Sequence, residues 1–250
     1  MKSNVCRLIS TSLLIAAVAS ATAAEKFPRV QPGWVRAVAI VNEMDPEVTH
    51  AHVGKTIFGT FEHKFENDWN IPDFVNSTLS RKLGEHGIAS RTVELTAAER
   101  DLFFGGRCLS KWSGKFRPEC AAPIKTMLDK LKVDAIAVIQ PASGSAEGFS
   151  EQAVVWNYGV YTAGLGDSKD ATIYDYDTLR IYGSDPPTML DSRSCSTGEQ
   201  TEHDFGKPIG QATLSDIDWI KPLLENLLEK KVDDRLKASG LIPGEPTTCP

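Results

Sequence analysis

Two short apolar runs constrain the fold of this chain more than any other feature of its sequence. Residues 34–42 (WVRAVAIVN) and 134–140 (DAIAVIQ) are almost unbroken apolar stretches, and the first is rich in Val and Ile. Strands that are buried on both faces show this pattern, because neither face meets water. Each run therefore predicts a central strand of a sheet that is covered on both sides.

The segments that precede and follow these runs have the periodicity of helices. In residues 71–83 an apolar side chain recurs at every fourth position, and Pro72 lies in the first turn. A strand is expected at 88–95, and a second helix begins near Pro123, ahead of the run at 134–140. Helices that are each followed by a strand indicate βαβ crossovers, so the sheet should be partly parallel.

The pattern changes after residue 140, where we expect antiparallel pairing. Residues 153–163 and 172–182 alternate in polarity and are joined by GLGDSKDA, which is typical of a hairpin. The other expected elements are a strand at 54–61, a candidate strand at 188–195, a surface loop at 196–211 and a last helix from Ser215 to Gly240. In this helix Ser215 and Asp218 are expected to form a capping box, and Pro222 marks either a kink or the true start of the helix. Together they predict an α/β sandwich with a mixed, partly parallel sheet, helices packed on it, and an antiparallel hairpin in the C-terminal half.

The order of these elements between Trp34 and Leu236 resembles that of small α/β domains from bacterial envelope assemblies. Examples are the periplasmic part of the curli secretion channel and the N-terminal domain of the Tol–Pal propeller protein. The resemblance contains no diagnostic motif, so it implies a fold and assigns no role to any residue.

The N-terminus has the features of a secretory signal peptide in the usual order. Lys2 and Arg7 precede an apolar run at 8–19, and the small residues ATAA follow at 21–24. The run is about 12 residues long, whereas a helix needs about 20 to span a bilayer. We therefore expect cleavage after Ala24, export to the periplasm or the exterior, and no transmembrane segment in the mature chain.

The mature chain is long enough for one α/β domain with a real core. Removing 24 residues from 250 leaves 226, which we assign to a single domain at 25–250 with a C-terminal tail at 240–250. The removed segment carries Lys2 and Arg7 and no acid, so the net charge changes from −6 to −8. A negative charge of this size argues against nucleic acid or an anionic lipid surface as a partner.

Cleavage also leaves an even number of cysteines. It removes Cys6 and retains Cys108, Cys120, Cys195 and Cys249. In an oxidising compartment this indicates two disulfides, for which three connectivities exist. We favour Cys108–Cys120, which closes a short loop, with Cys195–Cys249 holding the tail. The alternative is a zinc site, although the sequence has no close Cys-x-x-Cys pair.

Side chains that can bind a metal gather after the first apolar run. His50 and His52 are two apart, so a strand would place both imidazoles on one face, and Asp45 or His63 could complete the site. Ligands in open α/β sheets bind beyond the carboxyl ends of parallel strands, which suits this position. The alternative is a polar loop with solvated histidines.

The segment after the second apolar run is rich in small residues. Residues 141–148 (PASGSAEG) could hold an anion with backbone N–H groups. However, no helix is expected to follow, and the Gly-x-Ser-x-Gly pattern of a nucleophile elbow is absent. We therefore expect a flexible loop.

Aromatic side chains recur at even positions along the predicted hairpin. They are Trp156, Tyr158, Tyr174, Tyr176 and Tyr182. Positions two apart on a strand share a face, so these residues form one patch if the faces align. Such a patch can bind sugars, peptides or proteins, or it can be core beneath the last helix, and we favour the core.

These features leave two classes of function. The favoured one is a non-enzymatic binding or assembly module of the envelope, because the sequence shows no activated nucleophile and no evident cofactor fingerprint. The other is a metal-dependent or hydrolytic enzyme that uses residues 43–63. The sequence does not decide between them. Convergence of His50, His52 and a carboxylate in one pocket would favour the enzyme.

Overall fold

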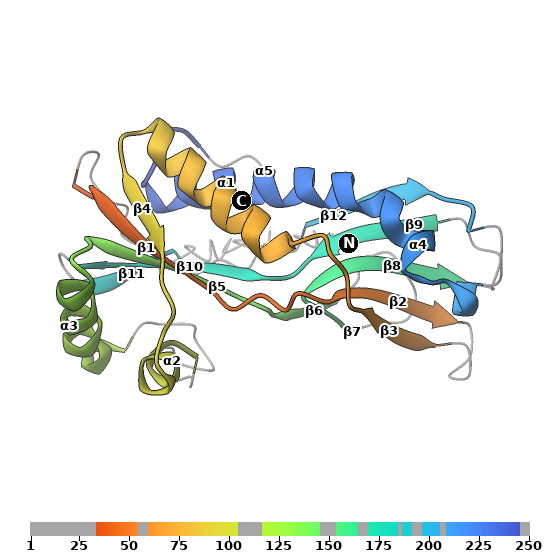
Figure 1. Ribbon diagram of the computed structural model, residues 1–250, viewed down its shortest axis with the longest axis horizontal. Helices are drawn as coiled ribbons and strands as arrows, with labels where there is room; N and C mark the ends of the chain where they lie inside the picture. The colour runs from red at the N-terminus through yellow and green to blue at the C-terminus, as the bar shows by residue number, and fades with distance from the viewer. Residues whose placement is uncertain are drawn as a thin grey trace, which may run out of the picture.

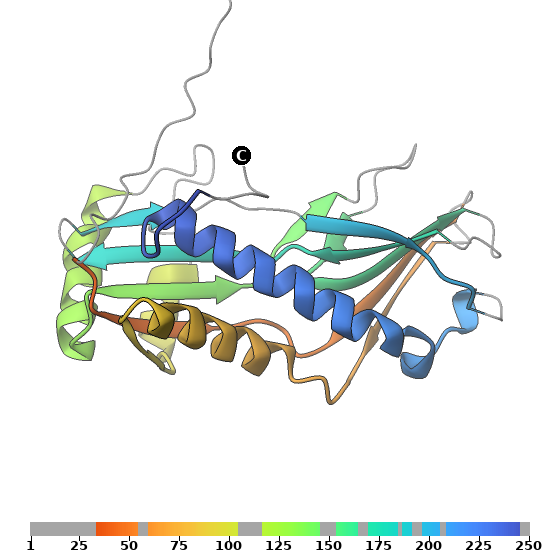
Figure 2. The same ribbon diagram turned by 90° about the horizontal axis from the view of Figure 1, so that it is seen from above.

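Two five-stranded sheets and two long helices form the body of the protein. The computed structural model describes residues 34–54, 60–104, 117–145, 154–164, 170–184, 187–191, 197–205 and 209–245. The sheets lie end to end, and helix α5 (Lys221–Ser239) runs along one side of both, next to α1 (Ile71–Glu85) (Figure 1). The view from above shows that α5 packs over the body along most of its length (Figure 2).

Sheet A confirms that the two apolar runs are inner, neighbouring strands. Its order is β11-β10-β5-β1-β4. The strands are β1 (Ala37–Asn42), β4 (Ala89–Thr92), β5 (Ala135–Gln140), β10 (Thr178–Ser184) and β11 (Pro187–Asp191). Strand β1 is parallel to both β4 and β5, whereas β10 is antiparallel to β5 and β11. The predicted α/β fold with a mixed, partly parallel sheet is therefore confirmed.

Sheet B has the order β12-β9-β8-β2-β3 and is also mixed. Its strands are β2 (Val48–Gly54), β3 (Phe61–Phe65), β8 (Tyr158–Gly164), β9 (Asp170–Asp175) and β12 (Thr197–Glu202). Strand β2 ends at Gly54 and β3 begins at Phe61, and the strand expected at 54–61 falls mostly on residues 55–59, outside the described ranges. The loop expected at 196–211 contains β12, which is polar in sequence and forms through backbone pairing with β9.

The predicted C-terminal hairpin is confirmed for its first part only. Strands β8 and β9 pair antiparallel, with Tyr158 opposite Asp175. The alternating pattern continues beyond Asp175, but the chain leaves sheet B there and enters sheet A at Thr178. A second, short hairpin pairs β6 (Ser143–Ser145) with β7 (Val154–Trp156). The flexible loop expected at 141–148 is thus partly a strand.

The helices follow the predicted pattern, with one change at the start of the last one. The shorter ones are α2 (Ala97–Phe104), η2 (Pro118–Cys120), α3 (Ala121–Leu131), η3 (Ile209–Gln211), α4 (Leu214–Ile217) and η4 (Asp218–Ile220). The capping box is formed by Thr213 and Asp216, not by Ser215 and Asp218. Pro222 lies in the first turn of α5 and marks its start, and Gly240 ends it with a φ of 80°.

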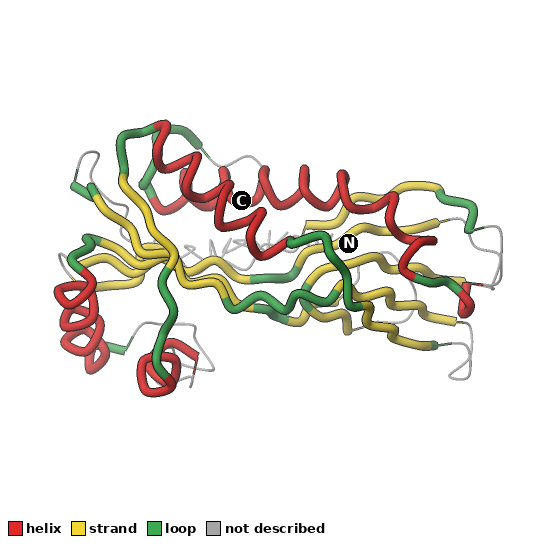
Figure 3. The backbone as a smooth tube through the Cα atoms, viewed as in Figure 1, coloured by secondary structure: helices red, strands yellow, loops and turns green. Residues whose placement is uncertain are grey.

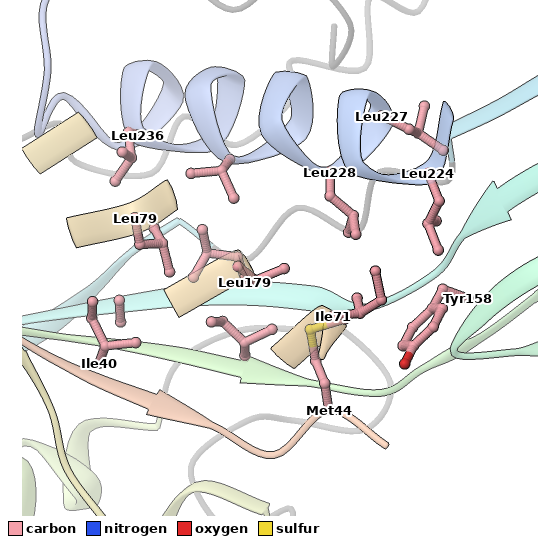
Figure 4. Packing of buried hydrophobic residues seen from close by; sticks show 14 of the residues in the cluster. Ile40, Met44, Ile71, Leu79, Tyr158, Leu179, Leu224, Leu227, Leu228 and Leu236 are labelled. Carbon is pink, nitrogen blue, oxygen red and sulfur yellow. The ribbon is translucent and has the colours of Figure 1, made fainter. Parts of the chain in front are cut away.

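Hydrophobic cores lie on both faces of the sheets. The largest fills the space beneath α1 and α5, where Leu79 and Leu228 pack toward the strands and Tyr158 extends the core to sheet B (Figure 4). A second core lies between α3 and the other face of sheet A and includes Leu128 and Tyr182. A third lies on the other face of sheet B, where Val155 of β7 packs with Tyr161 and Tyr174.

Several expectations concern residues outside the described ranges. The signal peptide at 1–24 and the end of the tail at 246–250 are among them. Cys120 is buried and disulfide-bonded, but the other cysteines also lie outside these ranges, so both predicted pairings stay predictions. No helix in the described part of the chain is long and apolar enough to cross a membrane.

Candidate functional site

The hairpin of β6 and β7 carries an exposed apolar face. Val154 is 73% exposed and Trp156 is 40% exposed, and these two are the exposed large apolar side chains of the described residues. They are two positions apart on β7, so they point the same way. Val155 between them points the other way and is buried against sheet B. The tube drawing shows this hairpin on the side of the strands away from α5 (Figure 3).

Asn157 fixes the junction between the hairpin and sheet B. Its φ is 58°, a left-handed conformation that Asn tolerates better than most residues. The Asn157 N–H donates to the carbonyl oxygen of Ala142 at 2.9 Å, and its Nδ2 donates to that of Asp45 at 3.1 Å. Its own carbonyl accepts from the Tyr176 N–H at 2.7 Å. The chain is therefore turned sharply and held between β7 and β8.

The ring of Tyr176 lies directly against the backbone of β6. A Cβ atom added to Gly144 would lie 1.8 Å from Cε1 of Tyr176, far inside contact distance. Tyr174 is next to it, with ring centroids 5.6 Å apart, and its hydroxyl donates to the Trp156 carbonyl at 3.4 Å. These contacts set the position of the hairpin and hence of its exposed face.

We expect Gly144→Ala to displace the Tyr176 ring and loosen the hairpin. Overpacking of this kind typically costs about 1–3 kcal/mol of unfolding free energy. Urea unfolding followed by circular dichroism measures the loss. Gly210→Ala is the control, because a Cβ there would meet Phe61 at an ordinary 3.6 Å. Equal stability of the two variants would contradict the tight packing at Gly144.

The structure divides the five predicted aromatic residues among three places. Trp156, Tyr174 and Tyr176 lie at the hairpin, as described above. Tyr158 points into the core beneath α5, and Tyr182 belongs to the core beneath α3. The even positions do not form one face, because Asn157 interrupts the alternation and β10 lies in sheet A. Burial raises the pKa of Tyr158 and of Tyr182.

The predicted histidine pair shares one face of β2, as its spacing requires, but the rings bind a hydroxyl group. His50 and His52 are both buried. His50 Nε2 lies 3.1 Å and His52 Nδ1 lies 2.9 Å from Oγ1 of Thr162 on β8. Phe61 of β3 stacks on His52 with a centroid distance of 5.2 Å and on His63 at 4.6 Å.

The electrostatic environment of the pair disfavours positive charge. Burial, together with His52 and His63, lowers the pKa of His50 to about 4. Burial also lowers the pKa of His52. His50 Nδ1 is buried and has no hydrogen-bond partner among the residues that the structure describes. At neutral pH the imidazoles of His50 and His52 are therefore both neutral.

The carboxylate proposed for the metal site points elsewhere. Asp45 Oδ1 accepts from the Glu47 N–H at 3.0 Å, and Oδ2 lies 3.9 Å from Lys64 Nζ. Lys64 follows His63 on β3, so its side chain is on the opposite face from the histidines. Within the described ranges, no three His, Cys, Asp or Glu side chains are placed to hold a metal ion. The arrangement favours an aromatic histidine cluster over a metal site.

Two important residues had no signal in the sequence. Val154 lay in a strand that was expected to run unbroken to residue 163, so its place on a separate hairpin was missed. Phe205 lay in the predicted loop, yet its ring stacks on His50 with a centroid distance of 5.9 Å and an interplanar angle of 2°. Predicting the place of Val154 would have required knowledge of the left-handed turn at Asn157. Predicting the place of Phe205 would have required knowledge of how the chain folds back onto sheet B after β12.

Comparison with known proteins gives only distant likeness. No protein-family model and no curated protein matches the sequence. Among solved structures, the hypothetical protein CT253 from Chlamydia trachomatis is similar with 12% identity over 83% of this chain and 98% of that chain, at a TM-score of 0.40. The lipoprotein GNA1162 from Neisseria meningitidis has 12% identity over 78% and 98%, at 0.28. Protein XCC0632 from Xanthomonas campestris, of the DUF330 family, has 10% identity over 82% and 87%, at 0.35. Similarity at this level assigns no function to this chain.

Proposed function

We propose that the protein is an exported, non-enzymatic binding or assembly module of the envelope, and that a protein partner docks on the apolar face of the β6–β7 hairpin. The observation that carries this proposal is the joint exposure of Val154 and Trp156 on that face. Trp, with Tyr and Arg, is enriched among the residues that contribute most of the binding energy at protein interfaces.

The hairpin is also an incomplete sheet. Its two strands have three residues each, and a two-stranded hairpin is at best marginally stable in water unless it packs on something. Its Val155 face packs on sheet B, whereas its Val154 face is open. A partner that covers this open face would remove both side chains from water, and the negative charge of the chain favours a protein over nucleic acid or anionic lipid.

Photo-crosslinking tests the proposal at one residue. A photoreactive amino acid at position 154, in the full chain expressed in its native host, should give a discrete adduct with one protein. The same group at position 226, an exposed site on α5, should not give this adduct. An absent adduct at 154, or the same adduct at both positions, would overturn the proposal.

A second substitution shows whether the contact carries binding energy. With the photoreactive group kept at 154, Trp156→Ser should strongly reduce the adduct. Truncation of a Trp hot spot costs about 2 kcal/mol or more, which corresponds to roughly 30-fold in affinity. An unchanged yield would show that Val154 only lies near the partner.

A further inference from the structure

Four of the five histidines in the chain gather at one end of sheet B. His50 and His52 lie on β2, His63 lies opposite His50 on β3, and His203 follows β12. Residues 203–205, which we call the strap, connect them to the helical segment before α5. The Phe205 ring of the strap stacks flat on His50, and His203 stacks on Trp219 of η4 with a centroid distance of 4.2 Å.

We propose that this cluster is an acid-operated latch, in which protonation of His50 and His52 releases the strap from sheet B. The inference is independent of the hairpin, which packs on the opposite face of the sheet. At neutral pH the latch is closed, because the neutral rings pack against Phe61 and Phe205 and share the hydroxyl of Thr162. Protonation of the two rings makes the same contacts unfavourable and so destabilises the closed state.

The geometry gives two reasons for this reversal. The two imidazole nitrogens on Thr162 lie within about 6 Å of each other, so two protonated rings repel one another there. A protonated His50 ring must also carry a hydrogen on Nδ1, which is buried and has no acceptor among the described residues, so a charged ring is left with a desolvated N–H. Both costs are relieved when the strap lifts and water reaches the rings.

Among the described residues, the charges that act most on His50 belong to other histidines. The two that act on His50 are His52 and His63, and both oppose its protonation. The groups that the packed elements carry nearby are His63, Glu62 and Lys64 on β3, Glu202, His203 and Asp204 around the strap, and Asp218 on η4. Glu62 and Lys64 are exposed on the other face of β3, and Asp218 accepts a hydrogen bond from the Trp69 indole at 3.3 Å.

The direction and range of the pH response follow from these contacts. His50 has a pKa of about 4 when buried and an ordinary value of 6.5 when solvated. The closed latch is therefore fully stable above pH 6.5 and weakens as the pH falls toward 4, because only the open state binds the proton there. A shift of this size raises the opening equilibrium constant about 100-fold by pH 4.

Hydrogen exchange measured by mass spectrometry on the mature protein tests the latch. After correction for intrinsic rates, peptides that cover 197–205 and 209–220 should lose protection between pH 6.5 and 4. A peptide from α1 should stay protected over the same range. Unchanged protection at 203–205 would overturn the proposal, and so would simultaneous loss in α1, which would indicate global acid unfolding.

Two variants separate the latch from ordinary fraying. Gln cannot titrate, so the double variant H50Q/H52Q should keep the strap protected at pH 4 if it folds. Phe205→Ala leaves the histidines in place and should expose the strap already at pH 7. A pH response of the same midpoint and size in H50Q/H52Q would assign the effect to other titratable groups. Full protection of Phe205→Ala at pH 7 would show that the Phe205 ring does not hold the strap on His50.

Discussion

Replacing Lys231 with methionine is expected to lower the free energy of unfolding by about 3–5 kcal/mol, which is typical for removal of one partner of a buried ion pair. Lys231 is 2% exposed beneath α5. Its Nζ contacts Asp175 Oδ2 and Asp177 Oδ1, and donates to the Asp177 carbonyl at 2.8 Å. Burial and the neighbouring Asp177 raise the pKa of Asp175, so the ionised partner of Lys231 is Asp177. Without the ammonium, this buried charge would lose the cation that the three contacts place beside it.

The position of this ion pair explains why the loss should be large. Asp175 ends β9 and Asp177 precedes β10, so Lys231 holds the turn that carries the chain from sheet B to sheet A. Although burial opposes it, Lys231 lowers the pKa of Asp177 below its usual value. The loss should therefore affect both sheets at once and appear as one cooperative transition.

Urea unfolding at pH 7 measures the effect, and the neighbouring residue provides a matched control. Lys230 is exposed, so Lys230→Met should change stability by less than about 0.5 kcal/mol. The triple variant D175N/D177N/K231M should recover part of the loss, because it removes the buried carboxyl groups along with the cation. A Lys231→Met protein as stable as Lys230→Met would show that the buried pair contributes nothing.

Sequence patterns predicted the parts of the fold that depend on local periodicity. The side chains in the apolar runs of β1 and β5 are mostly buried, and so are those at the four-residue repeat of α1. The predicted elements therefore appear in the structure. The division of the strands into two sheets was not predictable in this way. It depends on the turn at Asp175–Asp177, whose partner Lys231 lies in a helix more than fifty residues later.

The candidate site shows the same limit. The spacing of His50 and His52 correctly placed both rings on one face of a strand. The spacing did not show that Thr162 would lie between the two rings, because Thr162 is on β8, a parallel neighbouring strand more than a hundred residues later in the chain. The aromatic patch failed as a single surface for a local reason, since a left-handed residue at Asn157 changes which way the following side chains point.

The second large effect is expected at Gly159, where the backbone of β8 lies directly against that of β2. A Cβ atom on Gly159 would lie 1.8 Å from the carbonyl oxygen of Thr49, its partner in the parallel pairing. The clashing atom belongs to the backbone, so no side-chain rotation relieves the overlap, and β2 must separate from β8. We expect Gly159→Ala to cost about 3 kcal/mol or more, the upper end of the range for overpacked sites.

A second glycine supplies a control with the opposite sign. A Cβ on Gly84, near the end of α1, would meet nothing within 4 Å. Because alanine is a better helix former than glycine, Gly84→Ala should stabilise the protein by about 0.5–1 kcal/mol. Urea unfolding followed by circular dichroism compares both variants with the original chain. If Gly159→Ala unfolded at the same urea concentration as the original chain, β2 and β8 could not approach as closely as this packing requires.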